Sequence, residues 1–206
     1  MKLTEIKSRK HLPRYLNENN LLGEGAEVGV KAGSYSNFLL EKWEGKRLYS
    51  IDAWSRYKFQ SNGTNTIIED APESKTKIKK DKFYNITKDT LSIHKERSVI
   101  LRMLSGDASK TINDNSLDFC YIDASHKYIQ IKNDIKCWLP KVRKGGILCG
   151  HDYDMDINKW IQKYGDRKYP HGGVKQAVDE LIEETKLNLH IDSISVLRTY
   201  SWYIKI

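Results

Sequence analysis

Cysteine is scarce in this sequence, and the three cysteines form no paired motif. Cys120, Cys137 and Cys149 are widely spaced, and no CxxC pair is present. Disulfide frameworks and cysteine-ligated zinc sites need such pairs, so both are disfavoured, and the pattern is typical of a reducing compartment. We therefore expect a cytoplasmic protein whose cysteines pack in apolar surroundings.

Long hydrophobic runs are also missing. No apolar stretch approaches the roughly 20 residues that a membrane-spanning helix needs. The N-terminal MKLTEIKSRKHL carries charges without the apolar segment of a signal peptide. No repeat, low-complexity tract or Gly/Ser linker divides the 206 residues, of which 39% are hydrophobic and 30% charged. We expect a single globular domain over residues 1–206.

Positive charge is in excess, with 35 lysines and arginines against 27 acidic residues and a net charge of +8. The sequence pI near 9.2 lies in the range of nucleic-acid-binding proteins. However, the lysines are spread along the chain, and the densest run, residues 75–82, fits the solvent face of a helix equally well. Charge alone identifies neither a fold nor a site, and we do not expect nucleic acid to be the partner.

Short apolar runs alternate with helical spacing through most of the chain. Strands are expected at residues 26–30, 47–52, 98–104, 116–123 and 147–150, and helices near residues 3–20, 35–43, 74–95, 131–139 and 174–184. The tail, ISVLR and then YSWYIKI, is typical of a hairpin. This order predicts an α/β fold with a Rossmann-like, doubly wound, mostly parallel sheet, helices on both faces and an antiparallel C-terminal strand.

Residues 53–73 break the alternation. They contain Trp54, Tyr57 and Phe59, then SNGTN and Pro72, without a clean period. Because a long irregular piece in a compact domain is often a functional lid, we expect this segment to recognise substrate, together with residues 153–173.

Polar residues follow the predicted strands. In doubly wound sheets, ligands bind beyond the carboxyl ends of the strands. Five such ends carry polar groups here: residues 27–33, Asp52, residues 105–108, Asp123 and the pair His151-Asp152. The sequence therefore predicts one site at this edge of the sheet.

The first turn, EVGVKAG, indicates the kind of ligand. Gly29 and Gly33 would let backbone approach a ligand, and the next helix would offer free N–H groups. Asp52, about 20 residues further on, can accept hydrogen bonds from the hydroxyls of a ribose. A third glycine for pyrophosphate is missing, so an adenosine ligand without pyrophosphate fits better than NAD. Glu27 would attract a cation, and S-adenosylmethionine, with its sulfonium and ammonium groups, meets both conditions.

Several motifs in order resemble those of class I S-adenosylmethionine-dependent methyltransferases. They are AEVGVKAGSYSNFLL, RLYSIDAW, LSGDAS, FCYIDASHKY, and GGILCGHDY followed by GGVKQAVDE. The resemblance runs from about residue 20 to residue 182, and the final SWYIKI suits the closing strand. More narrowly, the motifs are similar to those of small O-methyltransferases that act on sugars and sugar-bearing natural products.

The resemblance implies cofactor-binding roles. Glu27 and Gly29 would line the methionine part, Gly33 and Ser34 would lie at the turn, and Asp52 would hold the ribose.

The same resemblance places Asp107 and Ala108 beside the adenine and Asp123 where the cofactor meets the acceptor. Trp54 would cover the adenine or the ribose, or would only anchor the lid; both interpretations stay open.

Methyl transfer to oxygen needs a place for the hydroxyl proton, which a general base or a metal ion can provide. The candidate catalytic residues are Asp123, His126, His151 and Asp152. Two of them, Asp123 and Asp152, would converge if their strands are neighbours. His126 could instead belong to the start of the helix near Lys127, with Ser125 as its N-cap.

In related sugar O-methyltransferases, the positions matching Asp123 and residues 151–152 are acidic and hold magnesium. The resemblance therefore implies a metal site of Asp123, His151 and Asp152. The histidine departs from the pattern and would shift the preference toward manganese or another transition metal. Alternatively, His151 is a neutral general base.

The sequence thus predicts an S-adenosylmethionine-dependent O-methyltransferase with a small-molecule or glycan acceptor, methylated on a sugar hydroxyl. Glycans, nucleotide sugars and glycosylated metabolites all fit, and a divalent metal is left open. Such domains also occur fused to glycosyltransferases, so a larger parent chain is left open too. Two alternatives are an RNA-directed methyltransferase and a non-catalytic protein that binds an adenosyl ligand.

Overall fold

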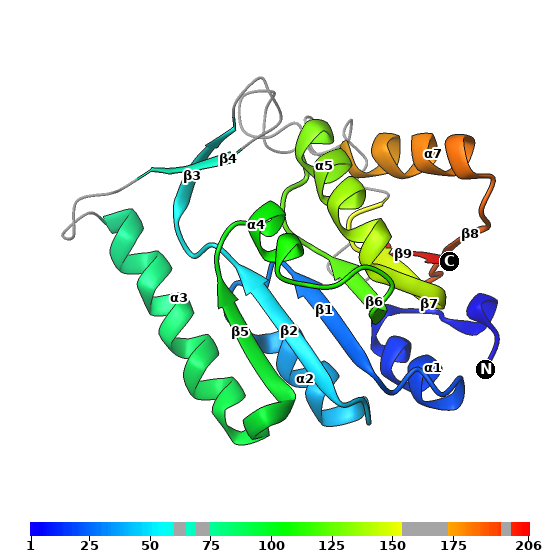
Figure 1. The fold of residues 1–206 in the computed structure, drawn as a ribbon, viewed down its shortest axis with the longest axis horizontal. Coiled ribbons are helices and arrows are strands. Elements are labelled where there is room, and N and C mark those ends of the chain that lie inside the picture. The colour runs from blue at the N-terminus through cyan, green and yellow to red at the C-terminus, as the bar shows by residue number, and fades with distance from the viewer. Residues whose placement is uncertain (60–64, 69–74, 154–172, 195–198) are drawn as a thin grey trace.

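A seven-stranded sheet forms the centre of the computed structural model (Figure 1). The structure describes residues 1–59, 65–68, 75–153, 173–194 and 199–206. The strand order is β5-β2-β1-β6-β7-β9-β8. The strands are β1 (Glu24–Val28), β2 (Arg47–Asp52), β5 (Ser98–Arg102), β6 (Leu117–Ile122), β7 (Val142–Gly150), β8 (Leu189–Ile191) and β9 (Trp202–Lys205). The first five are parallel to one another, and β9 pairs antiparallel with β7 and β8. The predicted fold class is confirmed.

Helices cover both faces of this sheet (Figure 1). They are α1 (Leu12–Glu18), α2 (Ser34–Lys42), α3 (Lys75–Leu91), α4 (Ser105–Lys110), α5 (Tyr128–Trp138) and α7 (Gly173–Thr185). Short 3-10 helices lie at Leu3–Glu5, Arg9–His11, Ser92–Arg97 and Leu139–Lys141. A small antiparallel sheet of β3 (Arg56–Phe59) and β4 (Asn65–Ile68) stands apart.

Strand β6 shows why helices are needed on both faces of the sheet. All six of its residues are buried. Cys120 and Ile122 belong to the core under α4, α5 and α7, whereas Phe119 and Tyr121 belong to the core under α1 and α2. Since neighbouring side chains in a strand point to opposite faces, a strand that is buried along its whole length requires helices on both sides.

The segment 53–73 contains more order than the sequence suggests. Residues 56–59 and 65–68 pair as the β3–β4 hairpin, and the rest of that segment from residue 60 lies outside the described residues. The second predicted recognition segment, residues 153–173, is described only at its two ends.

The C-terminal hairpin differs in its first strand. The partner of β9 is β8, upstream of the ISVLR stretch, of which residues 195–198 lie outside the described residues.

No helix in the described ranges combines the length and the apolar character needed to cross a membrane.

The parallel strands all end at one edge of the sheet, where β1 and β6 approach closely. The Asp123 N–H donates to the Val28 carbonyl at 2.7 Å, and the Gly29 N–H donates to the Ile51 carbonyl at 2.8 Å. Gly29 has φ +100, and a Cβ there would lie 2.2 Å from the Asp123 carbonyl oxygen. Only glycine fits this position, so the first predicted glycine is required by close packing of two loops.

Candidate active site

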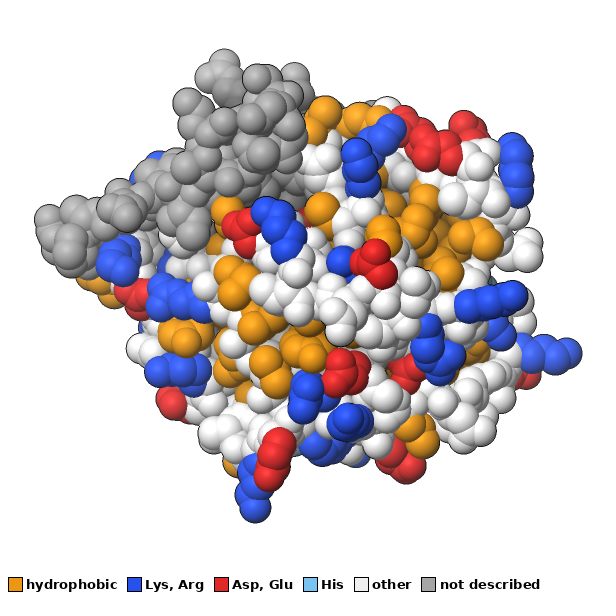
Figure 2. Space-filling view, viewed as in Figure 1, with side chains coloured by type: hydrophobic (Ala, Val, Ile, Leu, Met, Phe, Trp, Pro, Cys, Tyr) orange, Lys and Arg blue, Asp and Glu red, His pale blue; other side chains and the backbone are white. Residues whose placement is uncertain are grey.

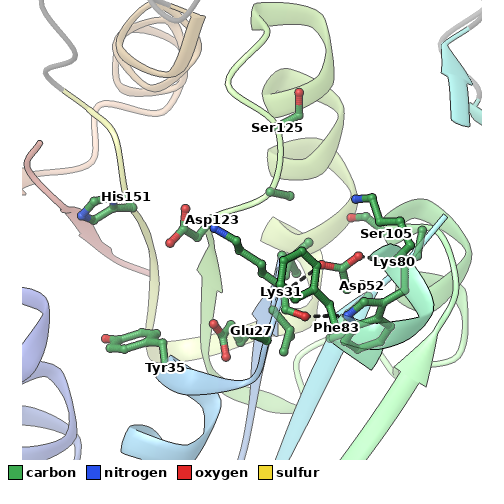
Figure 3. Close-up of a pocket in the computed structure, with 18 of the residues that line it drawn as sticks. Glu27, Lys31, Tyr35, Asp52, Lys80, Phe83, Ser105, Asp123, Ser125 and His151 are labelled. Atoms are coloured by element: carbon green, nitrogen blue, oxygen red, sulfur yellow. Dashed lines mark hydrogen bonds between the residues drawn. The ribbon is translucent and has the colours of Figure 1, made fainter. Parts of the chain in front are cut away.

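A cavity of about 1140 Å³ lies at this edge, and we call it the rim cavity (Figure 3). It is lined by the loops after β1, β2, β5, β6 and β7, by α3, by Arg9 and by Thr199. Nine of the residues predicted from the sequence line it: Glu27, Gly29, Ser34, Asp52, Trp54, Asp123, His126, His151 and Asp152. Strand order brings together side chains that are far apart along the chain.

Glu27 is a buried carboxyl group on β1, only 2% exposed. Its Oε2 accepts a hydrogen bond from Ser36, whose Oγ accepts another from Ser50 at 2.9 Å. Burial raises the pKa of Glu27 to about 8, and the nearby carboxyls of Asp123 and Asp52 add to the rise. A buried carboxyl at the floor of a cavity is suited to a cationic group, which would favour its ionised form.

Asp52 ends β2 and is held by two backbone groups. Its Oδ2 accepts the N–H of Lys31 at 2.9 Å, and its Oδ1 accepts the N–H of Trp54 at 2.8 Å. These bonds fix the carboxylate at the cavity wall (Figure 3). Each oxygen keeps a further lone pair for a ligand hydroxyl.

Trp54 connects three elements. Its indole is 1% exposed, its Nε1 donates to the Lys31 carbonyl at 2.6 Å, and its ring lies 5.1 Å from the Tyr84 ring of α3. These contacts give the side chain an anchoring role between the loops after β1 and β2, and it also lines the cavity.

Asp123 lies between a cation and a second acid. Its Oδ2 is 3.3 Å from Nη1 of Arg9, whose guanidinium stacks over the Tyr35 ring at 4.8 Å. The Tyr35 hydroxyl donates to the Arg9 carbonyl at 2.9 Å. The pKa of Asp123 is raised to about 6, because burial and, to a smaller extent, the Asp152 carboxylate outweigh the opposing effects of His151, Arg9 and His126. Arg9 is a site residue that no local motif indicates.

Asp152 accepts from both candidate histidines. Its Oδ2 lies 2.7 Å from Nε2 of His126, and its Oδ1 lies 3.0 Å from Nδ1 of His151. Burial alone would raise the pKa of Asp152, but the two histidine hydrogen bonds hold it well below its usual range. The pKa of His126 is raised, because Asp152 outweighs the opposing effect of burial.

The backbone of Asp152 is strained into the left-handed region, with φ +61. Lys31 and Trp54, which also line the cavity, have φ +57 and +41. Non-glycine residues seldom adopt this conformation, and they concentrate at functional sites. The strained turn after β7 directs the Asp152 carboxylate toward His126.

A possible metal-binding group differs from the predicted one. Asp123, His126 and Asp152 offer ligand atoms that all lie within 4.8 Å of one another. His151 is not in this group: its ring nitrogens contact Asp152 and the Thr199 hydroxyl, the latter at 3.1 and 3.3 Å. The structure thus places His126, not His151, with the two carboxylates. His126 also precedes the first helix position, because α5 begins at Tyr128 with Lys127 as N-cap. Two carboxylates and one imidazole are donors that fit a divalent ion such as Mn²⁺.

Three predicted cofactor residues are not among the described residues that line the cavity. Gly33 has φ +80 and is the N-cap of α2, so its role is conformational. The Asp107 side chain is exposed and pairs with Lys110 at 2.8 Å. Ala108 is buried in the core, and its N–H, like that of Asp107, donates to the Leu104 carbonyl. Near the start of α4, the cavity wall is formed by Leu104.

Ser105 and Asp134 also line the cavity near α4, and no sequence motif predicts either residue individually. The Ser105 hydroxyl donates to Asp134 at 2.6 Å and accepts from Nε1 of Trp138 at 2.9 Å. Burial raises the pKa of Asp134 to about 6. Ser105 stands at a predicted strand end, but nothing in its local sequence indicates the Asp134 partner.

Comparison with known proteins identifies the class that this fold and cavity define. A family model described as a methyltransferase domain matches residues 26–153, more than half of the chain. The chain belongs to this methyltransferase family, which confirms the predicted class I membership. No curated protein matches the sequence significantly.

Solved structures share the fold at low identity. An O-methyltransferase from Bacillus cereus, in complex with SAH, has a TM-score of 0.65 at 14% identity, over 96% of this chain and 80% of that one. A putative caffeoyl-CoA O-methyltransferase from Staphylococcus aureus has a TM-score of 0.63 at 14% identity, over 95% and 81%. An rRNA methylase from Streptococcus thermophilus has a TM-score of 0.55 at 12% identity, over 94% and 95%.

Proposed function

We propose that this protein is an S-adenosylmethionine-dependent O-methyltransferase that methylates a sugar hydroxyl, assisted by a divalent ion. The observation that carries the proposal is the convergence of Asp123, His126 and Asp152 in the same cavity as Glu27 and Asp52. One end of the cavity then suits a cationic adenosyl ligand, and the other suits a hydroxyl that must lose its proton.

The cofactor half rests on two carboxyl groups. Asp52 would accept hydrogen bonds from the ribose hydroxyls, and Glu27 would pair with the ammonium of the methionine part. Gly29, directly after β1, also lines this part of the cavity. The SAH complex of the Bacillus cereus neighbour is consistent with this choice of ligand.

The part of the cavity around Asp123, His126 and Asp152 must remove the proton of the acceptor hydroxyl. An ion held by Asp123, His126 and Asp152 would lower the pKa of the acceptor hydroxyl. Where no ion is bound, Asp123 or His126 would instead take the hydroxyl proton as a general base. The oxygen then attacks the methyl carbon, the carbon–sulfur bond breaks, and the sulfonium becomes a neutral thioether. The contacts of His151 with Asp152 and Thr199 give it a positioning role.

Sugars fit the acceptor half because vicinal hydroxyls can chelate an ion beside two carboxylates. The resemblance to sugar O-methyltransferases supports the same choice. Glycans, nucleotide sugars and glycosylated metabolites remain within the proposal.

RNA methylation is a second candidate, favoured by the net charge of +8 and by the rRNA methylase neighbour. In the space-filling view, basic and acidic side chains are interspersed on the visible face, without a continuous basic stripe (Figure 2). Base-independent RNA binding relies on such basic surfaces, so this face gives the RNA candidate no support.

Calorimetry with S-adenosylhomocysteine tests the cofactor half. We expect binding with a sub-millimolar Kd, and no binding in that range would refute the proposal. A screen of mono- and oligosaccharides with labelled cofactor, with Mn²⁺, Mg²⁺ or EDTA, tests the acceptor half. Transfer to RNA but to no sugar would favour the second candidate, and binding without any transfer would favour a non-catalytic protein.

A further inference from the structure

The Ser105 hydroxyl and the Asp134 carboxyl form a polar group in the cavity wall near the start of α4. In the close-up view, Ser105 lies beside Asp52 and away from Asp123 and His151 (Figure 3). Asp52 is the carboxylate that we assign to the ribose. A base attached to that ribose, on the side away from the methionine part, would therefore reach Ser105 and Asp134.

The Ser105 hydroxyl has a single proton, and that proton is already used. The hydroxyl donates to Oδ1 of Asp134 at 2.6 Å, while Nε1 of Trp138 donates to the Ser105 oxygen at 2.9 Å. Because an indole N–H is a donor only, it directs the hydroxyl proton toward the carboxyl group. Neither the hydroxyl nor an ionised carboxylate can then donate a hydrogen bond to a ligand, so both are acceptors.

The second oxygen of Asp134, Oδ2, faces the need for a donor. Within the described residues, the Ser105 hydroxyl is the only hydrogen-bond donor to this partly buried carboxyl group, and no cation pairs with it. Burial raises the pKa of Asp134 to about 6, so the group is ionised at neutral pH. Removing a carboxylate from water is costly unless hydrogen bonds compensate. Its place in a cavity wall therefore indicates a ligand that supplies a donor.

Adenine carries such a donor in its exocyclic amino group, whereas its ring nitrogens are acceptors. Leu104 and Phe83 also line the cavity and offer apolar contacts to a flat base. The acid predicted from the sequence for this role, Asp107, pairs with Lys110 at 2.8 Å and is not among the residues that line the cavity. Asp134 is thus better placed to meet the amino group.

We infer that Asp134 recognises the adenine of the cofactor by accepting a hydrogen bond from its exocyclic amino group. This inference rests on the proposed function, because it takes an adenosyl compound as the cofactor. Selectivity for adenine would then come from α5 rather than from the residues after β5. A base with a carbonyl group in place of the amino group would bring two acceptors together, and it would bind less tightly.

Calorimetry with S-adenosylhomocysteine and S-inosylhomocysteine at about pH 7.5 tests the inference. In the second compound a carbonyl group replaces the amino group of the base. The variant is Asp134→Asn, which keeps the size of the side chain. Ser105 would still donate to the amide oxygen, so the amide NH2 would face the base. The matched control is Asp107→Asn, which removes the same charge outside the cavity lining. Circular dichroism verifies that both variants are folded.

We expect the wild type to bind S-adenosylhomocysteine about tenfold or more tightly than S-inosylhomocysteine. In the Asp134→Asn variant the amide NH2 opposes the amino group and can donate to the carbonyl group, so this preference should be lost or reversed. A purely structural role of Asp134 would weaken both ligands equally and leave the ratio of affinities unchanged. The control should keep the wild-type ratio within about threefold, since it alters only screened surface charge.

Three outcomes would overturn the inference. The first is equal affinity of the wild type for the two compounds, which leaves the proposed function standing. The second is an equal loss of affinity for both compounds in the Asp134→Asn variant, which shows a structural role alone. The third is a loss of selectivity in the Asp107→Asn variant, which would assign the adenine to that acid. Absence of S-adenosylhomocysteine binding would instead refute the proposed function itself.

Discussion

The Nε2 atom of His126 lies 2.7 Å from Oδ2 of Asp152, which joins the loop after β6 to the loop after β7. Asp152 is also held by His151 at 3.0 Å. One carboxylate therefore organises two imidazoles, and it does so at a backbone φ of +61. The chemistry of the cavity should depend on this residue more than on either histidine.

Asp152→Asn should lower methyl transfer by roughly 100-fold, because the uncharged amide holds an ion less tightly and does not stabilise a protonated His126. The affinity for S-adenosylhomocysteine should change little, since the cofactor half is formed by other residues. Transfer from labelled cofactor and calorimetry measure the two effects. Asp114→Asn, at an exposed position paired with Lys141, is the control. Full activity of the Asp152 variant would contradict the proposed site.

His126→Ala should weaken Mn²⁺ binding by about tenfold or more, a loss that even outer-shell substitutions cause at metal sites. The ion can be followed by electron paramagnetic resonance of free Mn²⁺, without any acceptor. His94→Ala removes a histidine that contacts Asn37 elsewhere and should leave Mn²⁺ affinity unchanged. Equal affinity in the wild type and the His126 variant would exclude this imidazole as a ligand.

Arg9→Ala should raise the pKa of Asp123 above about 6, because Arg9 lowers that pKa in the wild type. The ion-binding form of Asp123 would then be reached at higher pH. We expect the pH midpoint of Mn²⁺ binding to rise by about one unit, the shift that loss of one close cation causes. Arg14→Ala, which breaks only an exposed pair with Glu18, serves as the control. An unchanged midpoint in the Arg9 variant would contradict the coupling.

Glu27 should couple stability to pH. Its pKa is raised from 4.5 to about 8, so the folded state holds a proton between these values that the unfolded state has lost. Stability from this group is therefore present below about pH 4.5 and is lost as pH rises to about 8. The slope is about 1.4 kcal/mol per pH unit for one proton. Denaturation curves of wild type and Glu27→Gln between pH 5 and 8 measure the difference. Parallel pH profiles would show that Glu27 has an ordinary pKa.

The Glu27 carboxyl group should release a proton when the cofactor binds. The ammonium group of S-adenosylhomocysteine favours ionised Glu27, so affinity for this ligand should rise with pH up to about 8. Calorimetry in two buffers of different ionisation enthalpy counts the released protons. Glu27→Gln should release none from this group, and an unchanged count would contradict the assignment.

The fold could be predicted from the sequence because its determinants are local. The apolar run of β6 and the spacing of Ile131, Ile135 and Trp138 in α5 each identify their element. Asp52 and Asp123 were predicted at the edge of the sheet for the same reason, since each directly follows or ends an apolar run.

The cluster around Asp152 could be predicted only in part. His126 has the local appearance of a helix start, and its partner stands beyond an entire helix and strand. Which histidine faces Asp123 depends on the left-handed turn at Asp152, and no residue pattern in HDY reveals that turn. In the structure the His126 imidazole, rather than that of His151, belongs to the group with Asp123 and Asp152.

The positions of the Arg9 and Asp107 side chains could not be predicted from local sequence patterns. Arg9 reaches Asp123 from 114 positions away, through packing against Tyr35. Asp107 sits at a strand end, but its place on α4 directs the side chain to Lys110 rather than to the cavity. Strand order predicts which loops meet, whereas side-chain direction depends on tertiary packing.

The walls of the rim cavity come from almost the whole length of the chain, with Arg9 near one end and Thr199 near the other. A fragment that lacks either segment therefore lacks part of the cavity wall. A ligand that fills the cavity would contact both segments and would stabilise the folded chain by mass action. Removal of Arg9 or Thr199 should therefore disturb the part of the cavity around Asp123 and His151 more than the part around Glu27 and Asp52.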